Sequence, residues 1–141
     1  MKAPWHLWVV GIASLLWNAG GAFDYYMTQT RNEAYMGQFT PEQLEYFYSY
    51  PAWSVAAWAV GVWLAVAGSV LLLLRSALAL WAFVLSFLGL ILTSVYSFGL
   101  AEVSMTAIVG TEAAIFTAAI AIISVLLIWY ARRMKMAGVL R

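Results

Sequence analysis

The sequence contains no cysteine and a single histidine. Without cysteine the chain has no disulfide, no thiolate nucleophile, no iron–sulfur cluster and no cysteine zinc site. The lone histidine, His6, has no second histidine and no acidic residue near it in the sequence. A closed metal site or a tuned catalytic base is therefore not expected there. We expect no metal and no cofactor, and we place His6 at a membrane interface.

The sequence is also poor in charged residues. Charged residues make up 9% of the chain and hydrophobic residues 65%, whereas a soluble domain carries roughly 25% charged residues. The sequence therefore predicts an integral membrane protein, with the lipid bilayer as its first partner. The basic residues are too few for nucleic-acid binding. The phosphate-loop, dinucleotide, HExxH and GxSxG motifs are missing as well, so we expect no enzyme activity.

Four apolar runs are long enough to cross a membrane, at residues 5–27, 51–74, 77–100 and 111–130. Each reaches the ~20 residues that a hydrocarbon core of about 30 Å requires. A single helix over 51–100 would be about 75 Å long, so the chain is predicted to reverse near Arg75. The predicted fold is an all-α integral membrane protein with one domain, an antiparallel four-transmembrane-helix bundle with a short outer interfacial helix.

The basic residues gather on one side of this topology. Those on the side of the termini are Lys2, Arg75, Arg132, Arg133, Lys135 and Arg141. Arg31 is the single basic residue on the other side, where the acidic residues are Asp24, Glu33, Glu42, Glu45, Glu102 and Glu112. The positive-inside rule then predicts that both termini, with a tail over 131–141, are cytoplasmic. Contact of the tail with anionic lipid and an ordinary positive-inside tail explain its charge equally well.

Each span carries a stripe of small or weakly polar residues. On the second span the stripe is a ladder at four-residue intervals, formed by Ala57, Gly61, Ala65 and Ser69. On the first span it comprises Gly11, Ser14, Asn18, Gly21 and Tyr25. Close approach of small residues and hydrogen bonds between helices hold membrane helices together. We therefore predict that the stripes face the bundle and that the bulky aliphatic residues between them face lipid.

The long outer connection covers residues 28–50. Thr40, Pro41 and Gln43 give it a helix start signal, with an N-cap, a first-turn proline and capping-box spacing. We predict a short helix over 41–48 that lies on the outer membrane surface. Two alternatives are that its aromatic residues fold over the bundle as a lid, or that they present a face to a partner protein. The candidate interface consists of Tyr46, Phe47, Tyr48, Tyr50 and Trp53.

Asp24 is the leading candidate for chemistry, because a carboxylate in or near the apolar zone is costly and needs a partner. Arg31 is its simplest partner, and hydration at headgroup depth and proton or cation coupling are the alternatives. Asn18 lies one to two turns deeper. Its amide is expected to bond a hydroxyl of the third span, Thr93, Ser94 or Ser97, as interhelical glue. The whole candidate polar site consists of Asn18, Asp24, Arg31, Thr93, Tyr96 and Ser97.

Several strings resemble a family of short proteobacterial four-span inner-membrane proteins of about this length. They are PWHLWVVGI, LLWNAGGAFDYYMTQTRNEAYM, FTPEQLEYF and GSVLLLLRS. The resemblance runs through most of the chain and is densest in residues 4–75. It implies a location in the bacterial cytoplasmic (inner) membrane. Such proteins are often labelled "sugar transporter", but the resemblance brings no mechanism and no functional residue to this chain.

Two functional hypotheses follow. The first is an accessory or interaction subunit of the cytoplasmic membrane that binds other membrane proteins or copies of itself. It is favoured because spans two to four carry packing stripes and no central ionisable residue. The second is a transporter or channel for a small polar solute such as a sugar. It would work as a homo-oligomer, because four spans rarely enclose a transport path alone. Asn18, Asp24, Thr93, Tyr96 and Ser97 would line that path.

Overall fold

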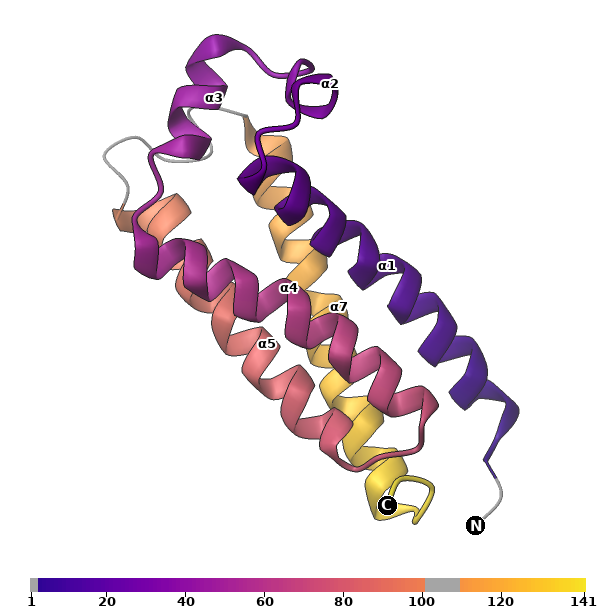
Figure 1. Cartoon of the computed structure of the whole chain (residues 1–141). Helices are drawn as coiled ribbons and strands as arrows, with labels where there is room; N and C mark the ends of the chain where they lie inside the picture. Colours follow the sequence, from indigo (N-terminus) through magenta and orange to yellow (C-terminus); the bar gives the residue numbers. More distant parts are fainter. Residues whose placement is uncertain (1–2, 101–109) are drawn as a thin grey trace.

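The computed structural model describes residues 3–100 and 110–141, and the regular elements of this part are all helices (Figure 1). They are α1 (Trp5–Gln29), α2 (Glu33–Met36), α3 (Pro41–Tyr48), α4 (Ala52–Leu73), α5 (Leu78–Val95), the π-helix η1 (Tyr96–Leu100) and α7 (Thr111–Met136). α1, α4, α5 with the start of η1, and α7 are long and apolar enough to cross a membrane. The predicted fold class is confirmed, and the chain is a multi-pass membrane protein. Lys2 and Glu102, which entered the predicted charge map, lie outside the described residues.

The long helices pack in chain order, α1 against α4, α4 against α5, and α5 against α7. Figure 1 shows the two termini at one end of the bundle and α2 and α3 at the opposite end. The first is the basic end, which carries the turn at Arg75 and the basic residues that follow Tyr130. The second is the aromatic end, formed by α2, α3, η1 and the adjoining turns of the long helices. Side chains also connect the first and last spans, α1 and α7: the centroids of the Trp17 and Phe116 aromatic rings are 5.9 Å apart.

The predicted reversal between the second and third spans is a tight turn around Arg75. This residue has a φ of 59°, a left-handed conformation that reverses the chain without a glycine. The C-terminal segment binds to the turn. The Arg141 N–H donates to the Arg75 carbonyl at 2.9 Å, and the Ala77 N–H donates to the Arg141 carbonyl at 2.8 Å. The Arg75 Nε also donates to the Val139 carbonyl at 3.2 Å.

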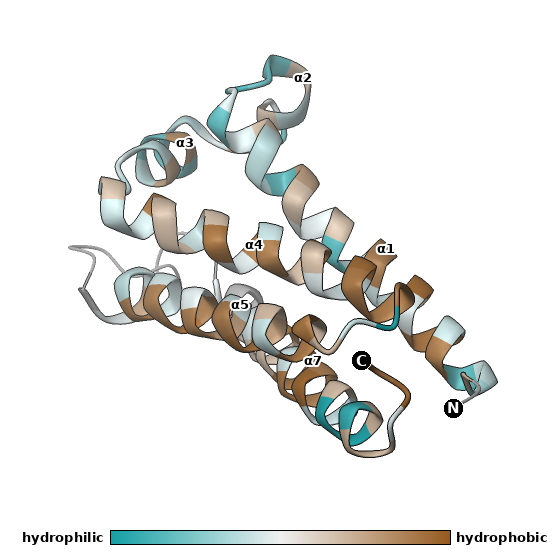
Figure 2. Cartoon of the chain, turned by 60° about the horizontal axis from the view of Figure 1, so that its bottom comes forward, coloured by the Kyte–Doolittle hydropathy of each residue, from teal (hydrophilic) through white to brown (hydrophobic). Residues whose placement is uncertain are grey.

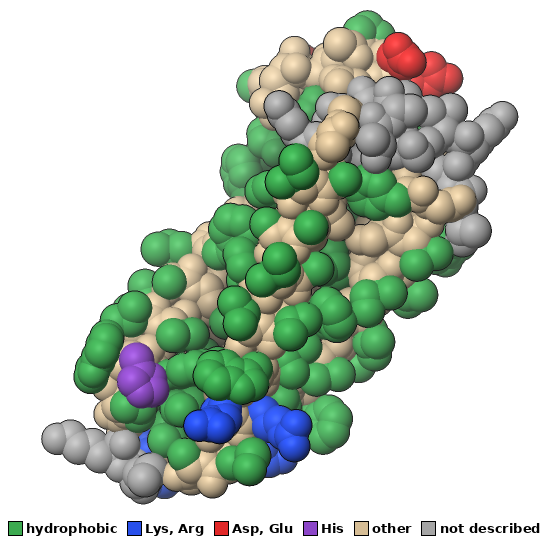
Figure 3. All heavy atoms as spheres, turned by 180° about the vertical axis from the view of Figure 1, so that it is seen from behind, with side chains coloured by type: hydrophobic (Ala, Val, Ile, Leu, Met, Phe, Trp, Pro, Cys, Tyr) green, Lys and Arg blue, Asp and Glu red, His purple; other side chains and the backbone are tan. Residues whose placement is uncertain are grey.

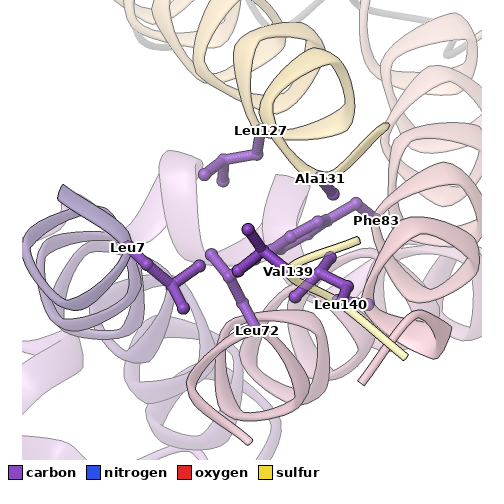
Figure 4. Packing of buried hydrophobic residues seen from close by; sticks show 8 residues of the cluster. Leu7, Leu72, Phe83, Leu127, Ala131, Val139 and Leu140 are labelled. Carbon is purple, nitrogen blue, oxygen red and sulfur yellow. The ribbon is translucent and has the colours of Figure 1, made fainter. Parts of the chain in front are cut away.

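Residues 131–141, the predicted tail, are partly helical and pack against the bundle. α7 continues to Met136, and Gly138, with a φ of 80°, turns the chain back towards the bundle. Val139 and Leu140 are 2% and 4% exposed. Figure 4 shows them among buried side chains from all four long helices: Leu7, Leu72, Phe83, Leu127 and Ala131. The apolar core at the basic end is therefore completed by the C-terminal residues.

The most extensive helix contact joins α4 to α5. At its centre a Cβ on Gly89 would lie 2.6 Å from the Ala57 carbonyl oxygen and 2.8 Å from the Gly61 nitrogen, so only glycine permits this approach. Close by, the Ser86 hydroxyl donates to the Gly61 carbonyl at 2.5 Å. Ala57 and Ser69 are buried. The small-residue ladder of the second span therefore faces the bundle, as predicted.

The outward faces of the long helices are apolar. Figure 2 shows hydrophobic residues along α4, α5 and α7. In Figure 3 apolar side chains cover the middle of one face, with Lys and Arg gathered at the basic end and acidic side chains at the other. This distribution suits a molecule surrounded by lipid with charged ends in the headgroups. α7 is the least buried of the four spans, because α5 is its one extensive neighbour.

Candidate functional site

Asn18 bonds to α4 and not to the third span. Its amide Nδ2 donates to the Ala65 carbonyl at 3.1 Å and to the Ser69 hydroxyl at 3.0 Å. The hydroxyls of Ser14 and Ser69, both buried, are 2.9 Å apart. The predicted role of Asn18 as interhelical glue is confirmed, but the predicted partners on the third span are wrong. The reason is the order of the helices, since α4 is the span that packs along α1.

Asp24 accepts a hydrogen bond from the hydroxyl of Tyr35, which lies on α2. The ring of Tyr35 also meets Phe23 edge to face, with centroids 5.6 Å apart. Burial, together with the hydrogen bond to Asp24 and the charge of that carboxylate, raises the pKa of Tyr35 from 10.0 to about 12. The predicted Asp24–Arg31 pair is wrong, because the chain turns at Arg31 and returns Tyr35 to the carboxylate.

Arg31 points to α3 instead. Its guanidinium carbon lies 4.1 Å from the centre of the Tyr48 ring, a cation–π contact. Arg31 has a φ of 52°, and the side chain of Asn32 then caps the start of α2. The left-handed turn therefore separates the two charges that a reading of the sequence would pair. The contact between Arg31 and Tyr48 joins the first half of the outer segment to the second.

The second half of the outer segment begins with the predicted capping box. The Thr40 hydroxyl accepts from the Gln43 N–H at 3.1 Å, and the Gln43 side chain accepts from the Thr40 N–H at 3.0 Å. The helix that follows is α3, Pro41–Tyr48, over the residues that were predicted. Its position on the outer membrane surface stays a prediction.

Tyr46 on this helix and Tyr50 just after it lie over η1, which continues α5. The Tyr46 hydroxyl donates to the Ser97 carbonyl at 3.1 Å, and the hydroxyls of Tyr50 and Ser97 are 2.5 Å apart. Ser97 lies on η1, and single π-helical turns are frequent at functional sites. Burial raises the pKa values of Tyr46 and Tyr50. Tyr46 and Tyr50 therefore match the lid alternative, in which the outer segment folds over the bundle.

Ring contacts extend this lid. Tyr96 meets Tyr50 and Trp53, with centroid distances of 4.9 Å and 5.7 Å. On the other side Phe47 meets Phe39 at 5.1 Å. Of the predicted interface residues, Trp53 keeps much of its surface open, with 47% exposed. Most of the aromatic surface that was assigned to a partner is thus used within the chain.

The predicted polar site is divided into separate groups. Asn18 on α1 bonds to α4, Asp24 accepts a hydrogen bond from Tyr35 of α2, and Arg31 contacts the Tyr48 ring of α3. Tyr96 and Ser97 lie under the lid, and Thr93 donates to the Gly89 carbonyl of its own helix at 3.0 Å. Two apolar grooves lie elsewhere. One, of about 610 Å³, lies between α5 and α7. The other, of about 300 Å³, lies between α1 and α4 beside Phe23 and Trp63.

His6 joins α1 to α7 at the basic end. Its Nδ1 lies 2.5 Å from the Tyr130 hydroxyl, and the two rings meet edge to face. In the described part of the chain no group of three His, Cys, Asp or Glu side chains is placed to hold a metal ion. His6 therefore has a structural partner between two spans.

Comparisons of the chain with protein-family models, curated proteins and solved structures give no match. The family resemblance drawn from the sequence strings therefore stays a prediction. Function has to be inferred from the geometry of the chain itself.

Sequence reasoning did not assign a role to Tyr35 or to the Ser14–Ser69 pair. The two serines were recognised as members of the packing stripes, but the sequence did not predict that they face each other on adjacent spans. Tyr35 carries no such signal. Its bond to Asp24 depends on a left-handed turn at an arginine, a conformation that is uncommon for that residue.

Proposed function

We propose that this protein is an accessory or interaction subunit of the bacterial cytoplasmic membrane that binds a transmembrane helix of another membrane protein. The surface proposed for that helix is the α5–α7 groove, which lies on the halves of α5 and α7 nearest the aromatic end. We also propose that both termini are cytoplasmic. The positive-inside rule supports this, because Arg132, Arg133 and Lys135 lie at the end of the termini and Arg31 is the single basic residue at the other end.

The observation that carries this proposal is the lining of the groove. The α7 side of the groove consists of small residues, and the α5–η1 side adds Ser94 and Gly99 among bulky apolar residues such as Phe87 and Phe98. The small residues on α7 are Ala114, Thr117, Ala118 and Ala121. In lipid, helices associate through close approach of small residues and through hydrogen bonds from Ser and Thr. Several of the small residues elsewhere in the bundle are already used in contacts between neighbouring spans. Gly89 packs against Gly61, and Ser14 pairs with Ser69.

The geometry gives less support to a solute carrier. A site for a neutral polar solute needs several polar groups that converge in one cavity. The predicted path residues Asn18, Asp24 and Ser97 each have a partner in a different part of the chain. Neither groove is lined by any of the predicted path residues. We therefore assign the polar residues to packing and the groove to recognition.

Because the chain has no cysteine, the groove can be tested with single introduced thiols. Ala118→Cys places one in the groove, and Ala13→Cys places a matched one on the exposed face of α1. Both variants are labelled in native membranes with a photoreactive maleimide and irradiated. We expect one protein adduct of defined mass from Ala118→Cys and none from Ala13→Cys, because only the groove holds a partner helix.

Several outcomes would contradict this assignment. Equal adducts from both positions, or lipid adducts alone from the groove, would remove the groove as a protein-binding surface. An adduct of twice the chain mass would show that the groove binds a second copy of this chain and not a different protein. Sugar uptake by proteoliposomes that Asn18→Ala abolishes would overturn the proposal in favour of the solute carrier.

A further inference from the structure

The basic end lacks acidic side chains in the described part of the chain. Its cationic side chains are Arg75, Arg132, Arg133, Lys135 and Arg141. The acidic side chains that the structure describes belong to the aromatic end; they are Asp24, Glu33, Glu42 and Glu45. A group of like charges attracts anions from its surroundings. For a membrane protein the surroundings at this level are lipid headgroups.

Two of these cations are held against exposed indole rings. The Arg133 guanidinium carbon lies 5.6 Å from the Trp129 ring centre on the same helix. The Lys135 Nζ lies 6.0 Å from the ring centre of Trp81, which belongs to α5. The two tryptophans are 56% and 57% exposed. These four residues, the α5–α7 basic seam, thus bring two positive charges to the junction of two spans.

The tryptophans also set the depth of the charges. Trp81 lies in the first turn of α5, and Trp129 lies two turns before the end of α7. Indoles in such positions keep the ring in hydrocarbon and the N–H among the headgroups. The cations beside them therefore lie at the level of the lipid phosphates. Basic pockets between transmembrane helices are known to hold anionic headgroups.

We propose that the α5–α7 basic seam binds the phosphate headgroup of an anionic phospholipid. Arg133 offers the planar fork of donors that suits two phosphate oxygens, and Lys135 adds a point charge from the side of α5. Trp81 and Trp129 contact the glycerol and upper acyl region. The seam lies at the end opposite the proposed partner groove, so this site does not depend on the proposed function.

The test uses the full chain, purified in mild detergent with equal amounts of phosphatidylglycerol and phosphatidylcholine of identical acyl chains. Native mass spectrometry counts the lipids that stay bound. We expect the wild type to retain phosphatidylglycerol preferentially. Arg133→Gln with Lys135→Gln should lower the ratio of the two bound lipids by about 30-fold, since each basic residue near the surface contributes about fivefold.

The matched control is Arg132→Gln with Arg141→Gln, which removes the same charge from the same end but outside the seam. It should keep most of the preference. Equal losses in the two double variants would overturn the seam in favour of diffuse attraction by the whole end. A wild type that holds both lipids equally would overturn it outright. If inorganic phosphate, added at the same concentration as the lipid, displaced the bound phosphatidylglycerol, the ligand of the seam would be a free anion and the lipid proposal would be overturned.

Folding of the variants is checked separately by circular dichroism. Arg133 and Lys135 are exposed, so their replacement should leave the bundle intact. If the seam variant fails to fold, thermal unfolding of the wild type decides the question. An increase in its midpoint with added phosphatidylglycerol, and none with phosphatidylcholine, is the expected result, and equal midpoints would contradict the proposal.

Discussion

Replacing Gly89 by alanine should separate α4 from α5, because the added Cβ meets backbone on the facing helix. It would lie 2.6 Å from the Ala57 carbonyl oxygen and 3.2 Å from the Gly61 Cα. Backbone atoms cannot rotate away as a side-chain end can. The whole α4–α5 contact must therefore widen, and the Ser86–Gly61 hydrogen bond of 2.5 Å lengthens with it.

The size of the effect follows from three contributions. Overpacking of a tight contact typically costs about 1–3 kcal/mol. A weakened interhelical hydrogen bond adds about 0.6 kcal/mol on average. Alanine returns up to about 1 kcal/mol of helix propensity relative to glycine. Gly89→Ala should therefore lower the free energy of unfolding by about 1–3 kcal/mol.

Gly61→Ala is the matched control, with the same chemical change on the facing helix. Its Cβ would meet the nearest heavy atom, the Leu90 nitrogen, at 3.4 Å, an ordinary contact. We expect it to leave stability unchanged or to raise it by up to about 1 kcal/mol. Reversible unfolding in mixed micelles of mild detergent and dodecyl sulfate, followed by tryptophan fluorescence, measures both. A Gly89→Ala protein as stable as Gly61→Ala would refute the reasoning.

Three further outcomes are expected. Asn18→Ala should cost about 1 kcal/mol in the same unfolding assay, because two bonds to α4 are lost. Leu140→Ala should cost about 2–5 kcal/mol by leaving a cavity, and Met136→Ala, at a position 74% exposed, almost nothing. The Tyr35 contact should be fully stable below pH 10.0 and weaken as the pH rises through about 12, because the pKa of Tyr35 is raised in the folded state. Tyrosinate absorbance should lose this late step in Tyr35→Phe, and an unchanged titration would contradict the assignment.

The fold was predictable because the bilayer sets the length of each span. Hydropathy alone indicates four helices, and the predicted runs that correspond to α1, α4 and α5–η1 end within two residues of the helices. The cap at Thr40 was predictable for a similar reason. Its signal is local, and the Thr40 and Gln43 side chains make both bonds without help from the rest of the chain.

The partners of the polar residues were harder to predict, because they depend on which helices are neighbours. The stripe on α1 shows that Asn18 faces inward, but it does not say whether α4 or α5 lies opposite. Likewise, charge alone pairs Asp24 with Arg31. The observed bond to Tyr35 depends on backbone angles at Arg31 that composition does not encode.

The C-terminal return is a third case. Val139 and Leu140 are two apolar residues between Gly138 and Arg141, too short a pattern to show periodicity. Their burial becomes visible only once the turn at Arg75 provides carbonyl and N–H partners for the segment. A basic segment after the last span was therefore read as a tail, although its two apolar residues complete a core.

Packing in chain order has a consequence for how the molecule is made. Each span that enters the membrane finds its main neighbour already there, since α4 follows α1, α5 follows α4, and α7 follows α5. Insertion and packing can thus proceed together, with no earlier pair having to separate for a later helix. The exception is the return of Arg141 to the turn at Arg75. Until α7 has crossed the membrane, Val139 and Leu140 cannot cover Leu7 and Leu72. The apolar core at the basic end is therefore completed last.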